Sequence, residues 1–128
     1  MALKPSDSQA SEKIKRKQAL QAIPARHRLV TEARLDSGEV VIAYPVAVRP
    51  WMAKVLKLLR REPEGLMTRK LQLDVLGTAV WDLIDGQRTV HHVIERFANL
   101  YQLQTREAEI SVTQFLRELG RRGVIGMR

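Results

Sequence analysis

The sequence predicts an α+β fold of winged-helix-like type: an N-terminal three-stranded β-sheet followed by a three-helix bundle, with an inserted amphipathic helix. Two patterns predict this order. Side chains alternate in character with a period of two in the first half, and apolar residues recur at helical spacing in the second half. The chain has 128 residues, of which 45% are hydrophobic, as in one ordinary globular domain.

The first two strands are expected on either side of a turn cluster at 36–38. Residues 29–35 and 40–46 alternate in character, which predicts a β-hairpin with one buried face. Pro45 marks the end of regular pairing in the second strand. Alternation returns at 69–73, which predicts a short third strand.

Three helices follow, each with a start signal. Asp74, Thr89 and Thr105 are expected as N-caps, because their side-chain oxygens can accept from free N–H groups of a first turn. The sequence Asp85-Gly86 is expected to stop the first helix, and Gly120 or Gly123 the third. The positions expected to be buried are Leu76, Val80 and Leu83, then Val90, Val93, Ile94, Phe97, Ala98 and Tyr101, then Ala108, Val112, Phe115, Leu116 and Leu119.

Two segments lie outside this pattern. Residues 1–26 are polar with a basic cluster at 13–17, and we expect a disordered N-terminal arm with a nascent helix, or alternatively a polybasic arm that touches an anionic surface. The remaining residues, 27–128, form the domain, with an insertion at 47–68 that contains a helix at 51–61. Its apolar residues lie opposite its basic ones, and those expected to dock on a partner or a membrane are Trp51, Met52, Val55, Leu56 and Leu59.

The composition excludes several classes of protein. Cysteine is absent, so disulfides and cysteine chemistry are excluded, and together with the lack of a signal peptide this favours a cytoplasmic protein. His91 and His92 are neighbours that diverge on a helix, so neither a metal nor another cofactor is expected. No phosphate loop or nucleophile motif is found, and we expect no enzyme activity.

The segment from Leu73 to Val90, LDVLGTAVWDLIDGQRTV, resembles the central signature of PqqD-like proteins. The resemblance extends over residues 27–126, whereas the basic arm and the insertion depart from the compact family pattern. Further matching positions are Ile94, Phe97, Tyr101, Phe115, Leu116, Leu119 and Gly123-Val124-Ile125.

This resemblance implies a peptide-recognition element. Such a domain binds the leader segment of a ribosomally made precursor peptide and delivers it to a modifying enzyme, often a radical SAM protein. The leader adds as an extra strand beside the third strand and packs against the third helix, so that main-chain hydrogen bonds give affinity and side-chain pockets give selection.

The candidate peptide-binding residues form two groups. Ile110, Gln114, Arg117 and Arg121 form an outward row on the third helix because of their i, i+4, i+7, i+11 spacing. The strand group is Arg69, Lys70, Leu71, Gln72 and Leu73. A solvated helix face with one exposed Ile, and polar residues that protect an open sheet edge, remain the alternatives.

Two other functions stay open at this point. The net charge of +8 and the three-helix order are compatible with a winged-helix DNA-binding protein, although Glu107, Glu109 and Glu118 on the third helix make nucleic acid the less favoured partner. Helix 51–61 suggests a membrane-surface or enzyme-docking adaptor, while its alternative is packing on the domain itself or on a second copy of the chain.

Overall fold

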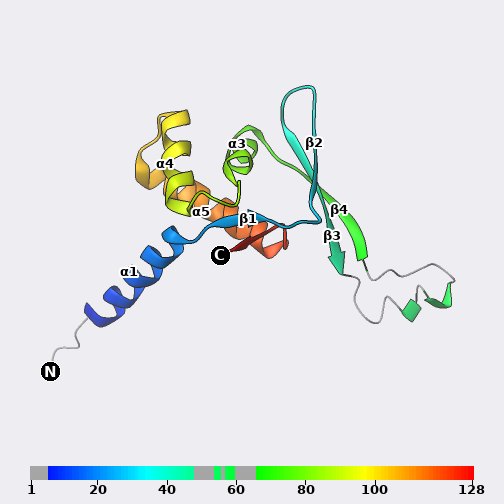
Figure 1. The fold of residues 1–128 in the computed structure, drawn as a ribbon, viewed down its shortest axis with the longest axis horizontal. Coiled ribbons are helices and arrows are strands. Elements are labelled where there is room, and N and C mark those ends of the chain that lie inside the picture. Colours follow the sequence, from blue (N-terminus) through cyan, green and yellow to red (C-terminus); the bar gives the residue numbers. More distant parts are fainter. Residues whose placement is uncertain (1–5, 48–53, 56, 60–65) are drawn as a thin grey trace. The chain divides into compact units, whose positions relative to one another are not determined.

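The computed structural model describes residues 6–47, 54–55, 57–59 and 66–128. The chain divides into two compact units, one formed by residues 1–27 with 79–128 and the other by residues 28–78. The first, the helical unit, contains α1 (Ser6–Gln21), α4 (Val90–Tyr101), α5 (Thr105–Arg121) and most of α3 (Val75–Leu83) (Figure 1). The second, the strand unit, contains β2 (Thr31–Arg34), β3 (Val40–Ala47) and β4 (Leu66–Gln72). The predicted α+β class is confirmed.

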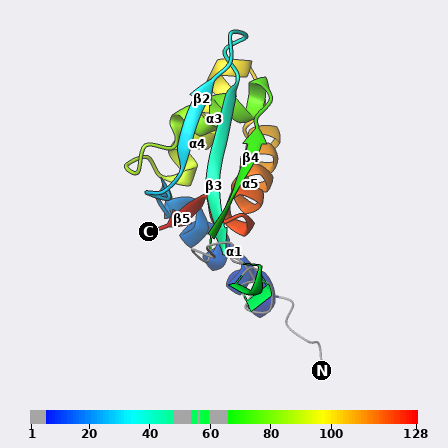
Figure 2. The ribbon, with the colours of Figure 1, turned by 90° about the vertical axis from the view of Figure 1, so that its right-hand side faces the viewer.

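The strand unit is an antiparallel sheet of order β2-β3-β4, so β3 is the central strand (Figure 2). Alternate side chains of β3 are buried, with Val40 and Ile42 fully covered and Tyr44 nearly so. All four residues of β2 are exposed, so the prediction that the first strand buries one face is wrong. Among the described strands, β2 is short and pairs with β3 alone, whereas β3 is flanked on both sides.

Three polar contacts fix the junction between the sheet and α3. Leu73 donates its backbone N–H to the carbonyl of Val40 at 2.8 Å, and the Val40 N–H donates to the hydroxyl of Thr78 at 3.1 Å. The Asp74 carboxylate accepts from the Gly77 N–H at 2.7 Å, which confirms its predicted role as an N-cap. Because Thr78 is 8% exposed and Val40 is 0% exposed, the hydroxyl satisfies a donor that water does not reach.

The starts of the next two helices differ in their chemistry. Thr89 caps α4 as predicted, since its hydroxyl accepts from the His92 N–H at 3.1 Å. The prediction for α5 is wrong by one residue: Gln104 occupies the N-cap position without a side-chain hydrogen bond, and Thr105 is the first helical residue. A residue with helical backbone angles cannot turn its side chain onto its own first turn as an extended N-cap residue does.

Glycines with positive φ follow two of the helices, as the sequence predicts. Gly86 has φ 79° after α3, and Gly123 has φ 73° after α5. At the end of α5 the N–H of Gly123 donates to Gly120 and that of Val124 donates to Leu119, both at 3.0 Å. This is the pairing of a Schellman motif, which satisfies the last helical carbonyls.

A polar turn follows α3. The Asp85 carboxylate accepts from the backbone N–H groups of Gln87 and Arg88, each at 2.9 Å. These hydrogen bonds, that from Arg88 first, lower the pKa of Asp85 below its ordinary value.

The core of the helical unit matches most of the predicted stripes. Trp81 and Phe97 are its largest buried side chains. Leu76 and Tyr101 were expected inside but are exposed, and Phe115 is only half-buried. The buried apolar residues of this unit are Val80, Trp81, Leu83, Ile84, Val90, Val93, Ile94, Phe97, Ala98, Ala108, Val112, Leu116, Leu119, Val124 and Ile125.

The N-terminal arm contains structure that the sequence did not predict. Helix α1 covers residues 6–21, where we expected a disordered arm with a nascent helix. Strand β1 (Pro24–Arg26) then pairs antiparallel with β5 (Ile125–Met127), so the two ends of the domain lie side by side (Figure 1). The Val90 N–H also donates to the carbonyl of Ala22 at 2.9 Å, which ties the end of α1 to the start of α4.

Most of the insertion lies outside the described residues. The predicted docking residues Trp51, Met52 and Leu56 are among those not described. Val55 and Leu59 are described and exposed, and the Leu59 N–H donates to the Val55 carbonyl at 3.1 Å, as in a helical turn. Over the described part of the chain, no helix has the length and apolarity that crossing a bilayer requires.

Candidate peptide-binding site

The outer edge of β4 is the first part of the candidate site. β4 pairs with β3 on one side, and no described strand pairs with its other side. Its register is fixed by direct pairs such as Ile42 with Leu71 and Ala43 with Lys70. The third strand of the sequence prediction is therefore an edge strand.

The register identifies the backbone groups on the open edge. Because the Leu73 N–H bonds to Val40, positions 73, 71 and 69 direct their N–H and C=O groups toward β3. The intervening residues Thr68, Lys70 and Gln72 direct theirs away from the sheet. The open edge thus offers a row of donors and acceptors at two-residue spacing, which an extended backbone can match.

The side chains of β4 divide between two faces. Leu73 is buried and Leu71 half-buried on the face that carries Val40 and Ile42. Lys70 and Gln72 are exposed on the other face. Five strand residues were predicted for the site. Leu71 and Leu73 place their side chains on the buried face, and Arg69, like them, directs its backbone groups toward β3. Lys70 and Gln72 supply backbone groups to the open edge.

The predicted row on α5 is exposed along its whole length. Ile110 is 46% exposed, and Gln114, Arg117 and Arg121 are exposed as well. Arg121 also forms an ion pair of 3.6 Å with Glu118. The row belongs to the helical unit and the β4 edge to the strand unit, so a groove shared by both remains a prediction.

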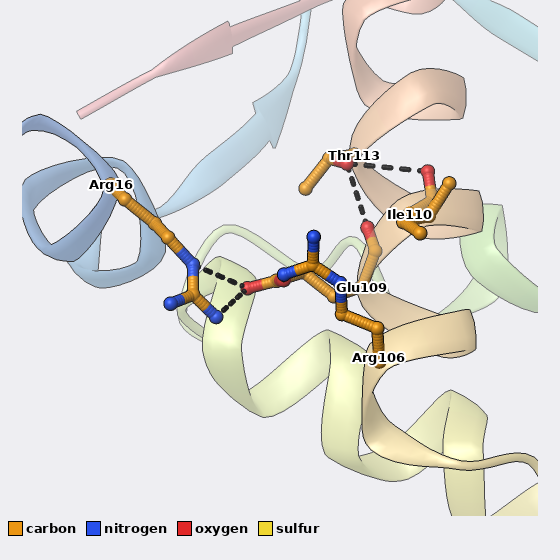
Figure 3. A network of polar contacts seen from close by, with 5 residues as sticks. All are labelled: Arg16, Arg106, Glu109, Ile110 and Thr113. Atoms are coloured by element: carbon orange, nitrogen blue, oxygen red, sulfur yellow. Dashed lines mark hydrogen bonds and ion pairs between the residues drawn. The ribbon is translucent and has the colours of Figure 1, made fainter. Parts of the chain in front are cut away.

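Sequence reasoning missed a polar contact beside this row. Arg16 of α1 donates from Nε and Nη2 to one oxygen of Glu109, at 3.0 and 2.6 Å (Figure 3). Arg106 approaches the other Glu109 oxygen at 3.7 Å, and the Glu109 side chain is only 14% exposed. Because Arg16 and Glu109 lie 93 positions apart, no local sequence signal could have paired them.

Other polar clusters do not suggest chemistry. Within the described ranges, no group of three or more His, Cys, Asp or Glu side chains could hold a metal ion. His91 pairs with Glu95 at 2.9 Å across one turn of α4, and both side chains are more than half exposed. This contact is a helix-surface pair.

Comparisons with known proteins identify a family and a similar fold. A family model described as "Coenzyme PQQ synthesis protein D (PqqD)" matches residues 53–125. A solved structure, "TbiB1 in Complex with the TbiA(beta) Leader Peptide", has a similar fold with a TM-score of 0.55 and 18% sequence identity, over 79% of this chain and 93% of that one. No curated protein matches this chain. Since the family match covers more than half of the sequence and includes the segment from Leu73 to Val90, the chain belongs to the PqqD family.

Proposed function

We propose that this protein is a non-catalytic peptide-binding module that captures the leader segment of a precursor peptide by strand addition at β4. The bound peptide is then presented to a modifying enzyme, with a radical SAM protein as the first candidate. Family membership supports this proposal, and so does the fold shared with a protein solved together with a leader peptide.

The open edge of β4 carries the proposal. Thr68, Lys70 and Gln72 direct their N–H and C=O groups away from β3, and no described strand takes them up. Three residues offer six groups at most. A net contribution of about 1 kcal/mol for each hydrogen bond gives roughly 6 kcal/mol in total.

Backbone pairing is therefore insufficient by itself. A micromolar complex needs about 8 kcal/mol after the cost of association has been met. Side-chain contacts must supply the difference, and the exposed row of Ile110, Gln114, Arg117 and Arg121 on α5 is the proposed source. We expect Ile110→Asp to weaken peptide binding while the fold survives, because half of this side chain is already in water.

A proline on the open edge tests strand addition directly. In Lys70→Pro the missing N–H is one that faces outward, so the β3–β4 ladder loses no hydrogen bond. Lys70→Val is the matched control, since it removes the same charge but keeps the N–H. Both variants are titrated against fluorescein-labelled synthetic peptides that correspond to the short reading frames beside the gene.

We expect the wild type and Lys70→Val both to bind one of these peptides, and Lys70→Val is the reference affinity because it already lacks the Lys70 charge. Lys70→Pro should bind it at least about fivefold more weakly, which corresponds to one lost hydrogen bond of about 1 kcal/mol. Equal binding by a folded Lys70→Pro variant would refute strand addition at this edge. Circular dichroism and thermal melting establish that the variants are folded.

A further inference from the structure

A hollow lies between α1 and α5 within the helical unit. Its volume is about 530 Å³, which is room for a few side chains. The Arg16–Glu109 contact closes one part of its wall (Figure 3). The lining residues are Glu12, Lys15, Arg16, Ala19, Leu20, Val90, Arg106, Glu109, Ile110, Thr113 and Arg117.

Helix α1 is held in place without an apolar stripe of its own. Residues 11–19 are all exposed, and Leu20 is half-buried. Its attachments among the described residues include the backbone bond from Val90 to Ala22, directly after α1, and the contact of Arg16 with Glu109. Helix α1 is therefore a polar helix that lines the hollow and contributes little to the apolar core.

The hollow has an excess of positive charge. Its lining includes four cations and two carboxylates, and Arg16 and Arg106 both face Glu109. Lys15 and Arg117 have no carboxylate partner among the described residues. Leu20 and Ile110 supply an apolar surface beside these cations.

We infer that this hollow binds an acidic segment of the precursor peptide, with a carboxylate placed between Lys15 and Arg117 and a neighbouring apolar side chain against Leu20 and Ile110. The inference rests on the proposed function and deepens it, because it assigns a chemical preference to the peptide. Helix α1 lies outside residues 53–125, so the family match does not supply this wall.

The chemistry of the lining favours a peptide over nucleic acid or a lipid surface. Glu12 on α1 and Glu109 on α5 line the hollow together with the cations and would repel the successive phosphates of a polyanion. A peptide with one carboxylate next to one apolar side chain would match the small positive excess of the hollow and its mixture of charged and apolar lining residues. Two of the α5 residues involved, Ile110 and Arg117, also belong to the predicted peptide row.

The test uses the full chain and a displayed library of random peptides. Peptides are selected on the wild type, and their affinities are then measured for two charge reversals on the same helix. Lys15→Glu changes the hollow, whereas Lys13→Glu is the matched control, because Lys13 is also exposed but does not line the hollow. Lys70→Pro is measured in parallel to follow strand addition.

The selected peptides should be rich in Asp or Glu next to Leu, Ile, Met or Phe. Lys15→Glu should weaken their binding about threefold to tenfold, as expected for the loss and reversal of an exposed charge, and Lys13→Glu should leave it unchanged. Exchanging the peptide's carboxylates for amides should remove the difference between Lys15→Glu and the wild type.

Three results would overturn the inference. If binding depends on Lys70 but not on Lys15, the hollow is not used although the proposed function stands. If no peptide is selected, both ideas fail together. If Lys15→Glu instead changes the sedimentation coefficient, or abolishes binding to duplex DNA or anionic vesicles, the occupant is a second copy, a nucleic acid or a membrane.

Discussion

The hydroxyl of Thr78 should be a main determinant of stability in the strand unit. It accepts the N–H of Val40 at 3.1 Å, where Val40 is 0% exposed and Thr78 is 8% exposed. Thr78→Val keeps the shape of the side chain and removes the acceptor. The Val40 donor would then be buried without a partner, which costs about 1–3 kcal/mol.

The matched variant Thr78→Ser retains the hydroxyl and loses one methyl group. Burial of that methyl contributes about 0.8 kcal/mol, so Thr78→Ser should be the less damaging change if the hydrogen bond dominates. At about 4 °C for each kcal/mol in a domain of this size, Thr78→Val should melt roughly 4–12 °C below the wild type. Thermal unfolding followed by circular dichroism measures both variants.

A melting temperature for Thr78→Val equal to that of the wild type would refute this reasoning, because it would show that the hydroxyl adds nothing beyond its volume. Peptide affinity provides a second measurement. Val40 also accepts from Leu73, the residue that follows β4, so loss of order at this junction should disturb the register of the open edge.

Further predictions concern the helical unit. Thr89→Ala should destabilise the protein by about 1 kcal/mol through loss of the α4 cap, whereas Thr105→Ala, which removes no capping bond, should fall within about 0.5 kcal/mol of the wild type in urea unfolding. A deficit for Thr105→Ala as large as that for Thr89→Ala would contradict the observed caps. Leu119→Ala should cost about 2–5 kcal/mol because Leu119 is 0% exposed, and a smaller loss in urea unfolding would indicate a core that collapses around the gap. The pKa of Asp85 is lowered in the folded protein, so its carboxylate stabilises the fold above its unfolded-state pKa and progressively less as pH falls through the folded-state value. Asp85→Ala should therefore differ most from the wild type near neutral pH and least in acid, and a constant difference in melting temperature would disprove the linkage.

The alternative functions can be tested separately. A DNA-binding role requires duplex affinity that falls steeply with salt concentration. A membrane role requires co-sedimentation with anionic vesicles that disappears in the Leu56→Glu/Leu59→Glu variant. Leu59 is exposed, so that double change also tests whether the insertion supplies a docking face.

The sequence alone determined most of the local structure. The two-residue alternation predicted β3 and most of β4, and the apolar spacing predicted the buried faces of α4 and α5. The expectation that Pro45 ends regular pairing was wrong, because β3 pairs with β4 as far as Ala47, and β4 begins at Leu66, inside the predicted insertion. The caps at Asp74 and Thr89 were also predictable, because a cap bonds to residues only three positions away. The segment from Leu73 to Val90 was recognisable as a family signature because its turn and cap residues lie close together in the sequence.

The tertiary structure decided which backbone groups point away from the described sheet and which distant side chains meet. The outward groups of Thr68, Lys70 and Gln72 follow from pairing with a strand some thirty positions earlier, and the contact between Arg16 and Glu109 spans 93 positions. Strand β1 is equally dependent on distant residues, since it pairs with the last residues of the chain. Local sequence patterns predict the helix or strand that each segment can form. The open edge and the hollow arise only where segments distant in sequence meet. Strand pairing uses backbone groups that every residue carries, so the sequence pattern does not specify which distant segments pair.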